Sequence, residues 1–270
     1  IDGRLLMRLV HPTAYVHPSA RLAPGVRIGA GAYVGARVLL ETGVVVGARV
    51  KIGERTSVGP NTTLLNCEVG KRCVLHAGVS VGADGFGFYV HEGRMHKKAQ
   101  LLRVILGNCV EVGAGSCIDR GSWRDTRVGD SSKLDNMVQI GHNALVGHNC
   151  MLCAHAALAG SASLGDDCVM GGKSAVADHV SIVGGVRLAA RCGVTTSITT
   201  PGDYGGMPAQ PIGKWRRQVA IIRRLGSKNL DRKVGGDSSD DAQQSRVLRG
   251  VFCAFVLGVL SATAAVVRHT

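Results

Sequence analysis

Aromatic residues are scarce in this chain of 270 residues, where phenylalanine, tryptophan and tyrosine together account for 4%. Conventional globular cores use aromatic rings to fill irregular space. A chain with so few of them needs a narrow, regular interior filled by small and branched aliphatic side chains, which is typical of solenoids. Glycine, by contrast, is abundant, with 38 residues.

Acidic residues are also in the minority, with 19 Asp and Glu against 32 Lys and Arg, so that the formal net charge is +13. Such a surface attracts acidic partners, and nucleic acid, an anionic membrane and an acidic carrier protein all fit the charge. The nine cysteines are odd in number, in a chain too long for a disulfide scaffold. This favours a reducing compartment.

An aliphatic residue or methionine recurs every six positions along most of the chain. The pattern runs in three stretches, and a one-residue shift occurs within the first. The positions are Val10, Val16, Leu22, Ile28, Val34, Leu40, Val46, Ile52, Val58, Leu64, Val69, Leu75 and Val81, then Leu106, Val112 and Ile118, then Val128, Leu134, Ile140, Val146, Leu152, Leu158, Leu164, Met170, Val176, Ile182, Leu188 and Val194. Such self-similarity identifies a repeat architecture.

The position two residues before each of these holds mostly alanine, valine, serine or threonine. Side chains two apart on a strand point to the same side. Each six-residue unit is therefore expected to be a short strand with one large and one small inward side chain, and glycine after the large one to mark a turn. Three strands close a triangular coil, so the sequence predicts an all-β fold, a left-handed parallel β-helix over residues 1–200. A β-sandwich would need turns every 8–12 residues instead.

Two interruptions break the period, and insertions are where a solenoid usually builds function. The longer one, residues 82–105, begins with Gly-Ala-Asp-Gly-Phe-Gly-Phe. It lacks the third glycine and the strand–helix unit of a dinucleotide-binding loop. The shorter one lies between Ile118 and Val128 and contains Arg120, Trp123 and Arg124.

The sequence after Val194 changes character. Residues 201–234 are expected to form a loop and a short basic helix from about Lys214 to Leu225, with apolar residues at helical spacing. Its arginines form either a solvated face or a docking patch for an acidic partner. Residues 235–249 are predicted to be a linker. Residues 250–267 carry no charge and are long enough to span a bilayer, with a helix buried in an oligomer as the alternative.

Histidines and cysteines cluster between His142 and His155, and Cys150 and Cys153 have a spacing common in zinc sites. The repeat register argues against a metal site, because Cys150 occupies the small inward position and Cys153 points the other way. We therefore predict no metal. The same register places further cysteines in the core as small apolar fillers: Cys67, Cys73, Cys168 and Cys192.

Residues 11–234 contain several separated motifs: Gly-Ala-Asp-Gly-Phe-Gly-Phe at 82–88, Ile-Asp-Arg-Gly at 118–121, Leu-Asp-Asn at 134–136, Gln-Ile-Gly-His-Asn at 139–143, Pro-Ala-Gln-Pro at 208–211 and Trp-Arg-Arg at 215–217. In sequence and in order, these motifs resemble those of the UDP-3-O-acylglucosamine N-acyltransferases of lipid A biosynthesis. Hexapeptide repeats alone would indicate only a superfamily, whereas this combination is more specific.

The resemblance implies transfer of a 3-hydroxyacyl group from acyl carrier protein to the 2-amine of a UDP-linked, 3-O-acylated glucosamine, with no bound cofactor. His142 matches the catalytic histidine of the family and would act as general base, for which the ordinary pKa of an imidazole is suitable. A backbone N–H of the next coil would stabilise the oxyanion. Gly160, 18 residues on, is the candidate.

Other residues acquire roles through the same resemblance. Asp135, Asn136 and Gln139 are expected to orient the histidine or to bind substrate, and His179, about two coils further on, to contact substrate. The basic helix would dock the acidic carrier protein through Arg216, Arg217, Arg223 and Arg224. The family implies a homotrimer and no nucleic acid. Repeats that begin at Val10 resemble the plant-type form, which lacks the N-terminal uridine-binding domain, and favour a mitochondrial location over the cytoplasm.

Three alternatives use the same fold. A CoA-dependent acetyl- or succinyltransferase would prefer CoA to carrier-protein thioesters. A γ-type carbonic anhydrase would need three zinc histidines, two of them five residues apart, and the pair with this spacing, His91 and His96, lies in the longer interruption rather than in the repeats. A β-helix that serves only as a scaffold would keep its properties when His142 is replaced.

Overall fold

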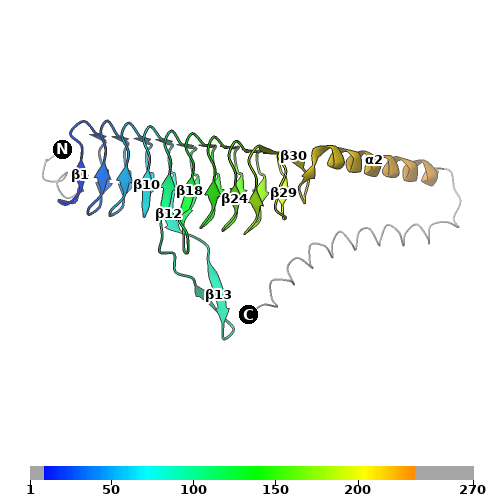
Figure 1. Cartoon of the computed structure of the whole chain (residues 1–270), viewed down its shortest axis with the longest axis horizontal. Helices are drawn as coiled ribbons and strands as arrows, with labels where there is room; N and C mark the ends of the chain where they lie inside the picture. The colour runs from blue at the N-terminus through cyan, green and yellow to red at the C-terminus, as the bar shows by residue number, and fades with distance from the viewer. Residues whose placement is uncertain (1–8, 235–270) are drawn as a thin grey trace. The chain divides into compact units, whose positions relative to one another are not determined.

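The computed structural model describes residues 9–234 of the chain (Figure 1). These residues fall into two compact units that divide between Trp215 and Arg216, and each unit is described by itself. The first is a β-solenoid in which each coil adds one short strand to each of three parallel sheets. The predicted left-handed parallel β-helix of hexapeptide repeats is confirmed.

The three sheets form the faces of a prism, and the chain passes repeatedly from face B to face C to face A. Face A contains β3 (Arg27–Ile28), β6 (Val45–Val46), β9 (Thr63–Leu64), β12 (Ser80–Asp84), β17 (Cys117–Arg120), β20 (Gln139–Ile140), β23 (Ala157–Leu158), β26 (Ala175–Val176) and β29 (Gly193–Val194). Face B contains β1 (Tyr15–Val16), β4 (Tyr33–Val34), β7 (Lys51–Ile52), β10 (Cys67–Val69), β15 (Val104–Leu106), β18 (Thr126–Val128), β21 (Leu145–Val146), β24 (Ser163–Leu164) and β27 (Ser181–Ile182). Face C contains β2 (Arg21–Leu22), β5 (Leu39–Leu40), β8 (Ser57–Val58), β11 (Val74–Leu75), β16 (Glu111–Val112), β19 (Lys133–Leu134), β22 (Met151–Leu152), β25 (Val169–Met170), β28 (Val186–Leu188), β30 (Gly202–Gly205) and β31 (Gln210–Pro211).

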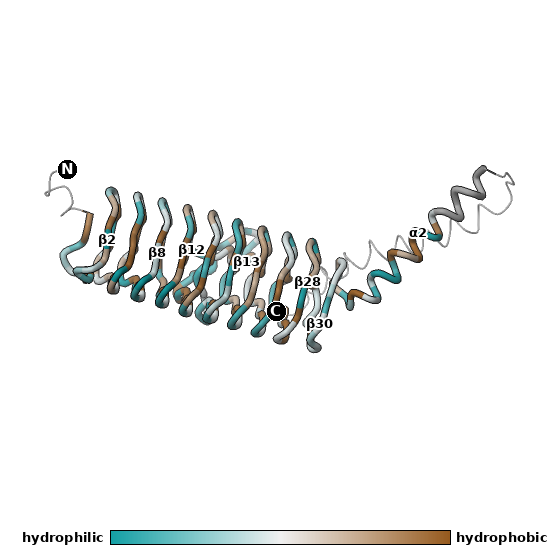
Figure 2. Tube along the Cα trace, turned by 90° about the horizontal axis from the view of Figure 1, so that it is seen from above, coloured by the Kyte–Doolittle hydropathy of each residue, from teal (hydrophilic) through white to brown (hydrophobic). Residues whose placement is uncertain are grey.

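The core of the prism is the six-residue ladder itself. From Ile28 to Val194 the large inward positions are buried, and the pairing of coils stacks them directly, as in the column of Leu134, Leu152 and Met170. Hydrophobic segments accordingly recur on every coil (Figure 2). Val16 and Leu22 are only partly buried, since they lie in the first coil, which has a neighbour on one side only. The inward cysteines, Cys150 among them, are buried as the register predicts.

The glycines that follow many of the large inward residues, such as Gly29 and Gly129, have a different structural reason from the expected turn. Gly29 does not adopt a left-handed backbone, but a Cβ atom there would lie 2.6 Å from the backbone nitrogen of Ala48 on the next coil. Gly129 is similar, with the carbonyl carbon of Gly147 at 2.6 Å. These glycines permit close stacking of the coils rather than the turn of the chain.

The turns are made by other residues, most of which are not glycine. Arg49 and Asn61, with φ of 59° and 56°, represent a position at the corners that adopts the left-handed conformation. This conformation costs an ordinary residue roughly 1–2 kcal/mol. The cost is offset because the N–H of each such residue donates a hydrogen bond to the coil below, from Arg49 to Ala30 and from Asn61 to Thr42.

The longer interruption projects from the prism as a β-hairpin (Figure 1). Strand β13 (Phe88–His91) pairs in antiparallel register with β14 (Arg94–Lys97), and every residue of both strands is exposed. The segment after Asp84, which leads into the hairpin, lies against the corner between faces A and B, where Gly85 is next to His142. This places the segment at the site described below.

Helix α2 (Ile212–Val234) begins two residues before the predicted start and extends beyond the predicted end at Leu225. Gly226 does not end it, since one glycine inside a helix costs only about 1 kcal/mol relative to alanine. Within residues 9–234 no helix is long and apolar enough to cross a membrane. The predicted linker 235–249 and apolar tail 250–267 lie outside the described residues.

Replacement of Leu75 by alanine should lower the free energy of unfolding by about 2–5 kcal/mol, as is typical when a buried leucine is truncated and leaves a cavity. Leu75 is 1% exposed, and the coils on both sides prevent the prism from closing around the missing atoms. Urea unfolding would measure the loss. The adjacent Val74 is 38% exposed, so Val74→Ala is the matched control, with a change of about 0.5 kcal/mol or less expected. Equal losses would contradict the assigned register.

Candidate active site

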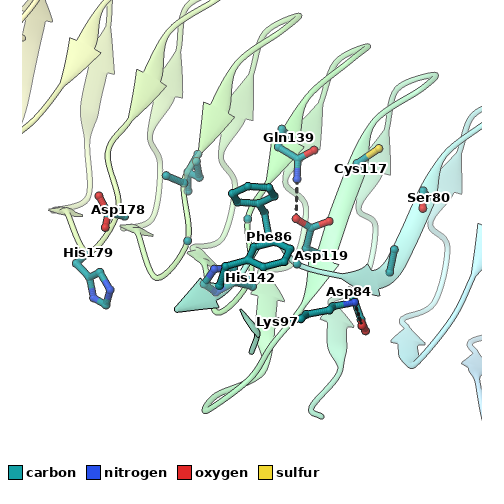
Figure 3. Close-up of a pocket in the computed structure, with 17 residues that line it drawn as sticks. Ser80, Asp84, Phe86, Lys97, Cys117, Asp119, Gln139, His142, Asp178 and His179 are labelled. Atoms are coloured by element: carbon teal, nitrogen blue, oxygen red, sulfur yellow. Dashed lines mark hydrogen bonds and ion pairs between the residues drawn. The ribbon is translucent and has the colours of Figure 1, made fainter. Parts of the chain in front are cut away.

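A pocket of about 820 Å³ lies against face A, at the corner where the coils pass to face B. Four residues singled out from the sequence line it: Gln139, His142, Gly160 and His179. The segment from Ala83 to Phe88 covers one side (Figure 3). Pockets of about 850 and 630 Å³ lie on faces B and C, so size alone does not identify the site. The chemistry of the lining residues does.

His142 is half-buried between two glycines. A Cβ atom on Gly85 would lie 2.5 Å from the Cβ of His142, and one on Gly160 would lie 2.6 Å from its Cε1 and 2.7 Å from its Nε2. Any side chain at either glycine would displace the imidazole. The loop from the long interruption and the next coil of the prism therefore hold the ring from opposite sides.

Asn143 fixes the protonation pattern of that ring. The side chain of Asn143 is 1% exposed, and its Oδ1 accepts hydrogen bonds from the backbone N–H groups of Ser122 at 2.7 Å and Trp123 at 3.3 Å. This orients the amide, so that its Nδ2 faces Nδ1 of His142 at 2.7 Å. An amide nitrogen can only donate. The neutral imidazole therefore accepts at Nδ1 and carries its proton on Nε2.

Residues of the shorter interruption hold Asn143 in place through hydrogen bonds to its backbone. Arg124 donates from Nε to the carbonyl of Asn143 at 2.6 Å and from its Nη2 to the carbonyl of Ser161 at 2.9 Å. Thr126 accepts a hydrogen bond from the N–H of Asn143 through Oγ1 at 2.9 Å. The irregular segment between Ile118 and Val128 thus positions the histidine without lining the pocket, apart from Asp119.

Burial lowers the pKa of His142 below its ordinary value of 6.5, and the nearby charges of Lys98 and His179 act in the same direction. A hydrogen bond with the backbone of Phe86 opposes the shift. The neutral form, which alone can accept a proton, therefore persists to lower pH than in a free imidazole.

Asp119 also lines this pocket, although the sequence argument assigned it no role. It follows Ile118 on β17, inside the Ile-Asp-Arg-Gly motif, and its Oδ2 accepts a hydrogen bond from Nε2 of Gln139 at 2.9 Å (Figure 3). Burial raises the pKa of Asp119 to about 6, against the effect of the Gln139 hydrogen bond. A shifted carboxyl group in a cleft is a candidate functional group.

Gly160 and His179 lie on successive coils above His142. Gly160 is in register with His142, and the N–H of His179 donates to the carbonyl of Gly160 at 3.1 Å. Within residues 9–234 the N–H of Gly160 donates no hydrogen bond. A free N–H beside the imidazole fits the oxyanion role expected for it.

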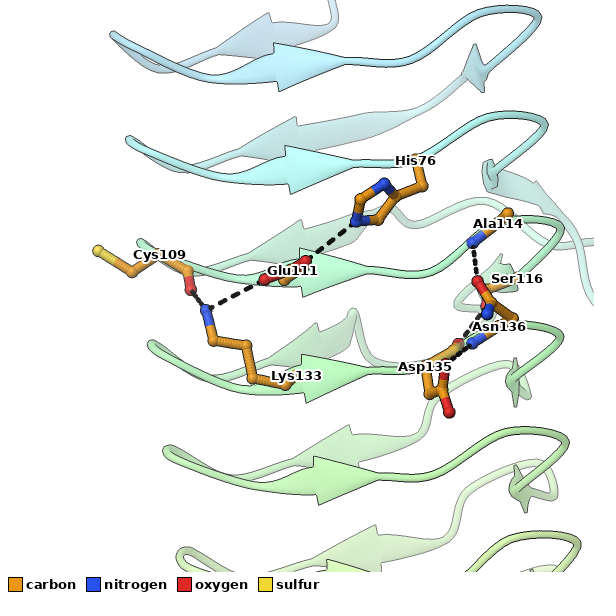
Figure 4. A network of polar contacts seen from close by, with 8 residues as sticks. All are labelled: His76, Cys109, Glu111, Ala114, Ser116, Lys133, Asp135 and Asn136. Carbon is orange, nitrogen blue, oxygen red and sulfur yellow. Dashed lines mark hydrogen bonds and ion pairs between the residues drawn. The ribbon is translucent and has the colours of Figure 1, made fainter.

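Asp135 and Asn136 do not line this pocket in a single chain. They lie at the corner between faces C and A, where Asp135 accepts from the N–H of Ala154 at 3.0 Å and Asn136 accepts from the N–H of Ala114 at 2.8 Å (Figure 4). Within one protomer they brace neighbouring coils and do not orient His142. The Leu134–Asn136 motif is close in sequence to Gln139–Asn143, but the two motifs lie at different corners of the prism, on either side of β20.

The four arginines of the expected docking patch, Arg216, Arg217, Arg223 and Arg224, are all exposed on α2. Of the expected apolar face, Ile222 and Leu225 are 67% and 57% exposed. The helix therefore presents basic and apolar side chains together. No group of three or more His, Cys, Asp or Glu side chains within residues 9–234 is arranged to hold a metal ion.

The repeats match a family model described as the hexapeptide repeat of succinyl-transferase, at residues 25–53, 49–83 and 137–172. Solved structures with the same fold include LpxA from Acinetobacter baumannii, with a TM-score of 0.57 and 22% identity over 78% of this chain and 77% of that one. UDP-N-acetylglucosamine O-acyltransferase from Moraxella catarrhalis gives a TM-score of 0.55 and 19% identity over 92% and 95%. The chain is thus a β-helix protein of the hexapeptide-repeat class.

Curated relatives indicate which proteins of this class the chain resembles. The chain is 54% identical over 160 residues to the probable UDP-3-O-acylglucosamine N-acyltransferase 2, mitochondrial, of Arabidopsis thaliana, covering 59% of this chain and 53% of that protein. It is 39% identical over 184 residues to UDP-3-O-acylglucosamine N-acyltransferase 2 of Rhodopseudomonas palustris, covering 68% and 49%. The predicted resemblance to UDP-3-O-acylglucosamine N-acyltransferases is confirmed, and the chain spans about half the length of the curated relatives it matches.

The imidazole of His142 should titrate with a midpoint below 6.5, because burial and nearby positive charge disfavour its protonated form. An NMR titration of the histidine ring protons would measure the midpoint, with the His142→Gln variant used to assign the resonance. A midpoint at or above 6.5 would contradict the described environment of the ring.

Proposed function

We propose that the chain is an acyltransferase that moves a 3-hydroxyacyl group from acyl carrier protein to the 2-amine of UDP-3-O-(3-hydroxyacyl)-glucosamine. The observation that carries this proposal is the placement of His142. Its imidazole lies in a pocket between two glycine backbones, and Asn143 fixes its orientation. The chain is also similar in sequence to proteins named UDP-3-O-acylglucosamine N-acyltransferase.

His142 acts as the general base in this reaction. The amine nitrogen attacks the thioester carbonyl carbon, the carbon–sulfur bond breaks, and His142 takes a proton from the attacking nitrogen and returns it to the departing thiolate. Because Nδ1 accepts from Asn143 in the free protein, acceptance at Nε2 requires the ring to exchange tautomers.

The N–H of Gly160 stabilises the oxyanion that forms as the thioester carbonyl is attacked. It belongs to the coil next to His142, and it has no competing partner among the described residues. A backbone donor held by the prism requires no rearrangement as the charge develops. His179 and Gln139 line the same pocket and contact the acceptor sugar.

The carrier protein docks on α2. Four exposed arginines and three exposed apolar residues, Ile221, Ile222 and Leu225, suit a partner that is acidic with an apolar patch. We further propose a homotrimer of prisms, which would bring the corner that holds Asp135 and Asn136 toward a neighbouring chain. A mitochondrial location is proposed from the relative so named.

Replacement of His142 by alanine should reduce turnover by about 10²–10⁴-fold, as expected when a general base is lost, and leave the melting temperature and oligomeric state unchanged. The assay follows transfer from acyl carrier protein to the amine, with acyl-CoA as a competing donor. His148→Ala is the matched control, because His148 occupies the same repeat position one corner on. Full activity of His142→Ala, or a preference for CoA, would overturn the proposal.

Charge reversal of Arg216, Arg217, Arg223 and Arg224 to glutamate should raise KM for the acyl carrier protein by about tenfold or more. The loss should shrink as salt is added, since exposed charges are screened. A short acyl-pantetheine thioester, which lacks the carrier protein, should show no change. Arg21→Glu with Arg27→Glu, at exposed sites on the early coils, is the control, and an equal effect there would rule out specific docking.

A further inference from the structure

We propose that Asp119 binds the amino group of the acceptor sugar as its ammonium ion, with Gln139 holding the carboxylate in place. This inference rests on the proposed function and names the group that selects an amine as acyl acceptor. It follows from the position of Asp119, from the lack of a cation beside it and from the chemistry of amine acylation.

The pairing of strands puts Asp119 beside His142. Strand β17 pairs with β20 in the register Ile118 to Ile140, so that Asp119 lies opposite Gly141, the residue before His142. Neighbouring strands are about 4.8 Å apart. Both side chains line the same pocket, and the close-up shows the Asp119 carboxylate hydrogen-bonded to Gln139 on the wall that also carries His142 (Figure 3).

Gln139 orients this carboxylate. Its Nε2 donates to Asp119 Oδ2 at 2.9 Å and to the carbonyl of Ile140 at 3.3 Å. The second contact holds the amide of Gln139 against its own strand. Within residues 9–234 no hydrogen bond reaches the other oxygen of Asp119, which is therefore available to a ligand in the pocket.

The lysine that lines the pocket and the arginine that follows Asp119 in sequence are both engaged elsewhere. Lys97 is paired with Asp84, with its Nζ 2.6 Å from Oδ2 of that residue. Arg120 donates from Nε to the carbonyl of Leu102 at 2.7 Å, and its Nη1 lies 3.8 Å from Asp84. No ion pair to Asp119 forms within 4.0 Å anywhere in residues 9–234. Asp119 is thus a half-buried carboxylate without a countercharge, and a cationic ligand would supply one.

The ionisation of Asp119 suits this role. Its pKa is raised to about 6 by burial, so the carboxylate is charged at neutral pH and loses its charge as the pH falls through that value. The other titratable groups that line the pocket are Asp84, Lys97, Cys117, His142, Asp178 and His179.

The reaction itself requires such a group. At neutral pH an aliphatic amine is largely an ammonium ion, which must lose one proton before its lone pair can attack and a second as the carbon–nitrogen bond forms. The departing thiolate takes up one of these, so one proton is released to solvent in each cycle. A carboxylate that accepts a hydrogen bond from the ammonium holds the nitrogen beside His142 until it is deprotonated. A hydroxyl acceptor carries no charge, so it can donate a hydrogen bond to Asp119 but cannot form an ion pair with it.

Binding measured without an acyl donor provides the test. By calorimetry at neutral pH, the wild-type protein should bind UDP-3-O-acyl-glucosamine about tenfold or more tightly than the corresponding glucose compound, which has a 2-hydroxyl group. Asp119→Asn should remove this preference, because it costs the amino compound an ion pair and the glucose compound at most a hydrogen bond. A purely structural role would weaken binding of both compounds equally and keep the preference. Asp130→Asn removes the same charge at another corner of the prism and should keep the preference.

Kinetics separates this inference from the proposed function. In Asp119→Asn, KM for the amino acceptor should rise about tenfold or more while KM for the donor stays the same. The defect should diminish as the pH is raised and the amine loses its charge. Equal affinity of the wild-type protein for both sugars, or an unchanged preference in Asp119→Asn, would overturn the role of Asp119. Lack of amine acylation by the wild-type protein would overturn only the proposed function.

Discussion

Backbone hydrogen bonds between successive coils are the interaction on which the rest of the structure depends. They fix the spacing of the coils and stack every residue on its counterpart in the neighbouring coil. The stacking then dictates the other features: single columns of inward aliphatic residues, glycines where two backbones come close, and left-handed corners that donate to the coil below. It also sets the site, because Gly160 reaches the imidazole only through its register with His142.

The candidate site arises where this regularity is interrupted twice in succession. The regular coils supply rigid positions for His142 and Gly160, whereas the two irregular segments supply what a uniform prism cannot. One covers the imidazole through Gly85, and the other orients it through the backbone of Ser122 and the side chain of Arg124. A rigid scaffold with local irregularity is how solenoids combine stability with chemistry. The buried amide of Asn143 links the regular coil to the irregular segment, because it contacts both His142 and the backbone of Ser122.

Periodicity made the fold predictable, because a strict six-residue ladder allows one way of burying its large side chains. It also placed the cysteines and gave the stacking of Gly160 on His142. Two features of the candidate site were not predicted from the period. The separation of Asp135 from His142 depends on which corner each occupies, a difference that closeness in sequence conceals. The pairing of Asp119 with Gln139 spans coils joined by an irregular loop, whose length shifts the register from 18 to 22 residues and hides the contact.

The regular coils at the start of the prism contact only their neighbours, so this end does not touch the pocket. Ala32 and Val38, for example, pack within a coil that no pocket residue touches. A whole coil could therefore be inserted or deleted at this end during evolution. The coils on either side would then pair with each other through the same aliphatic positions. Length is then a freely variable trait of this architecture, while the two irregular segments and the coils they join must be inherited together.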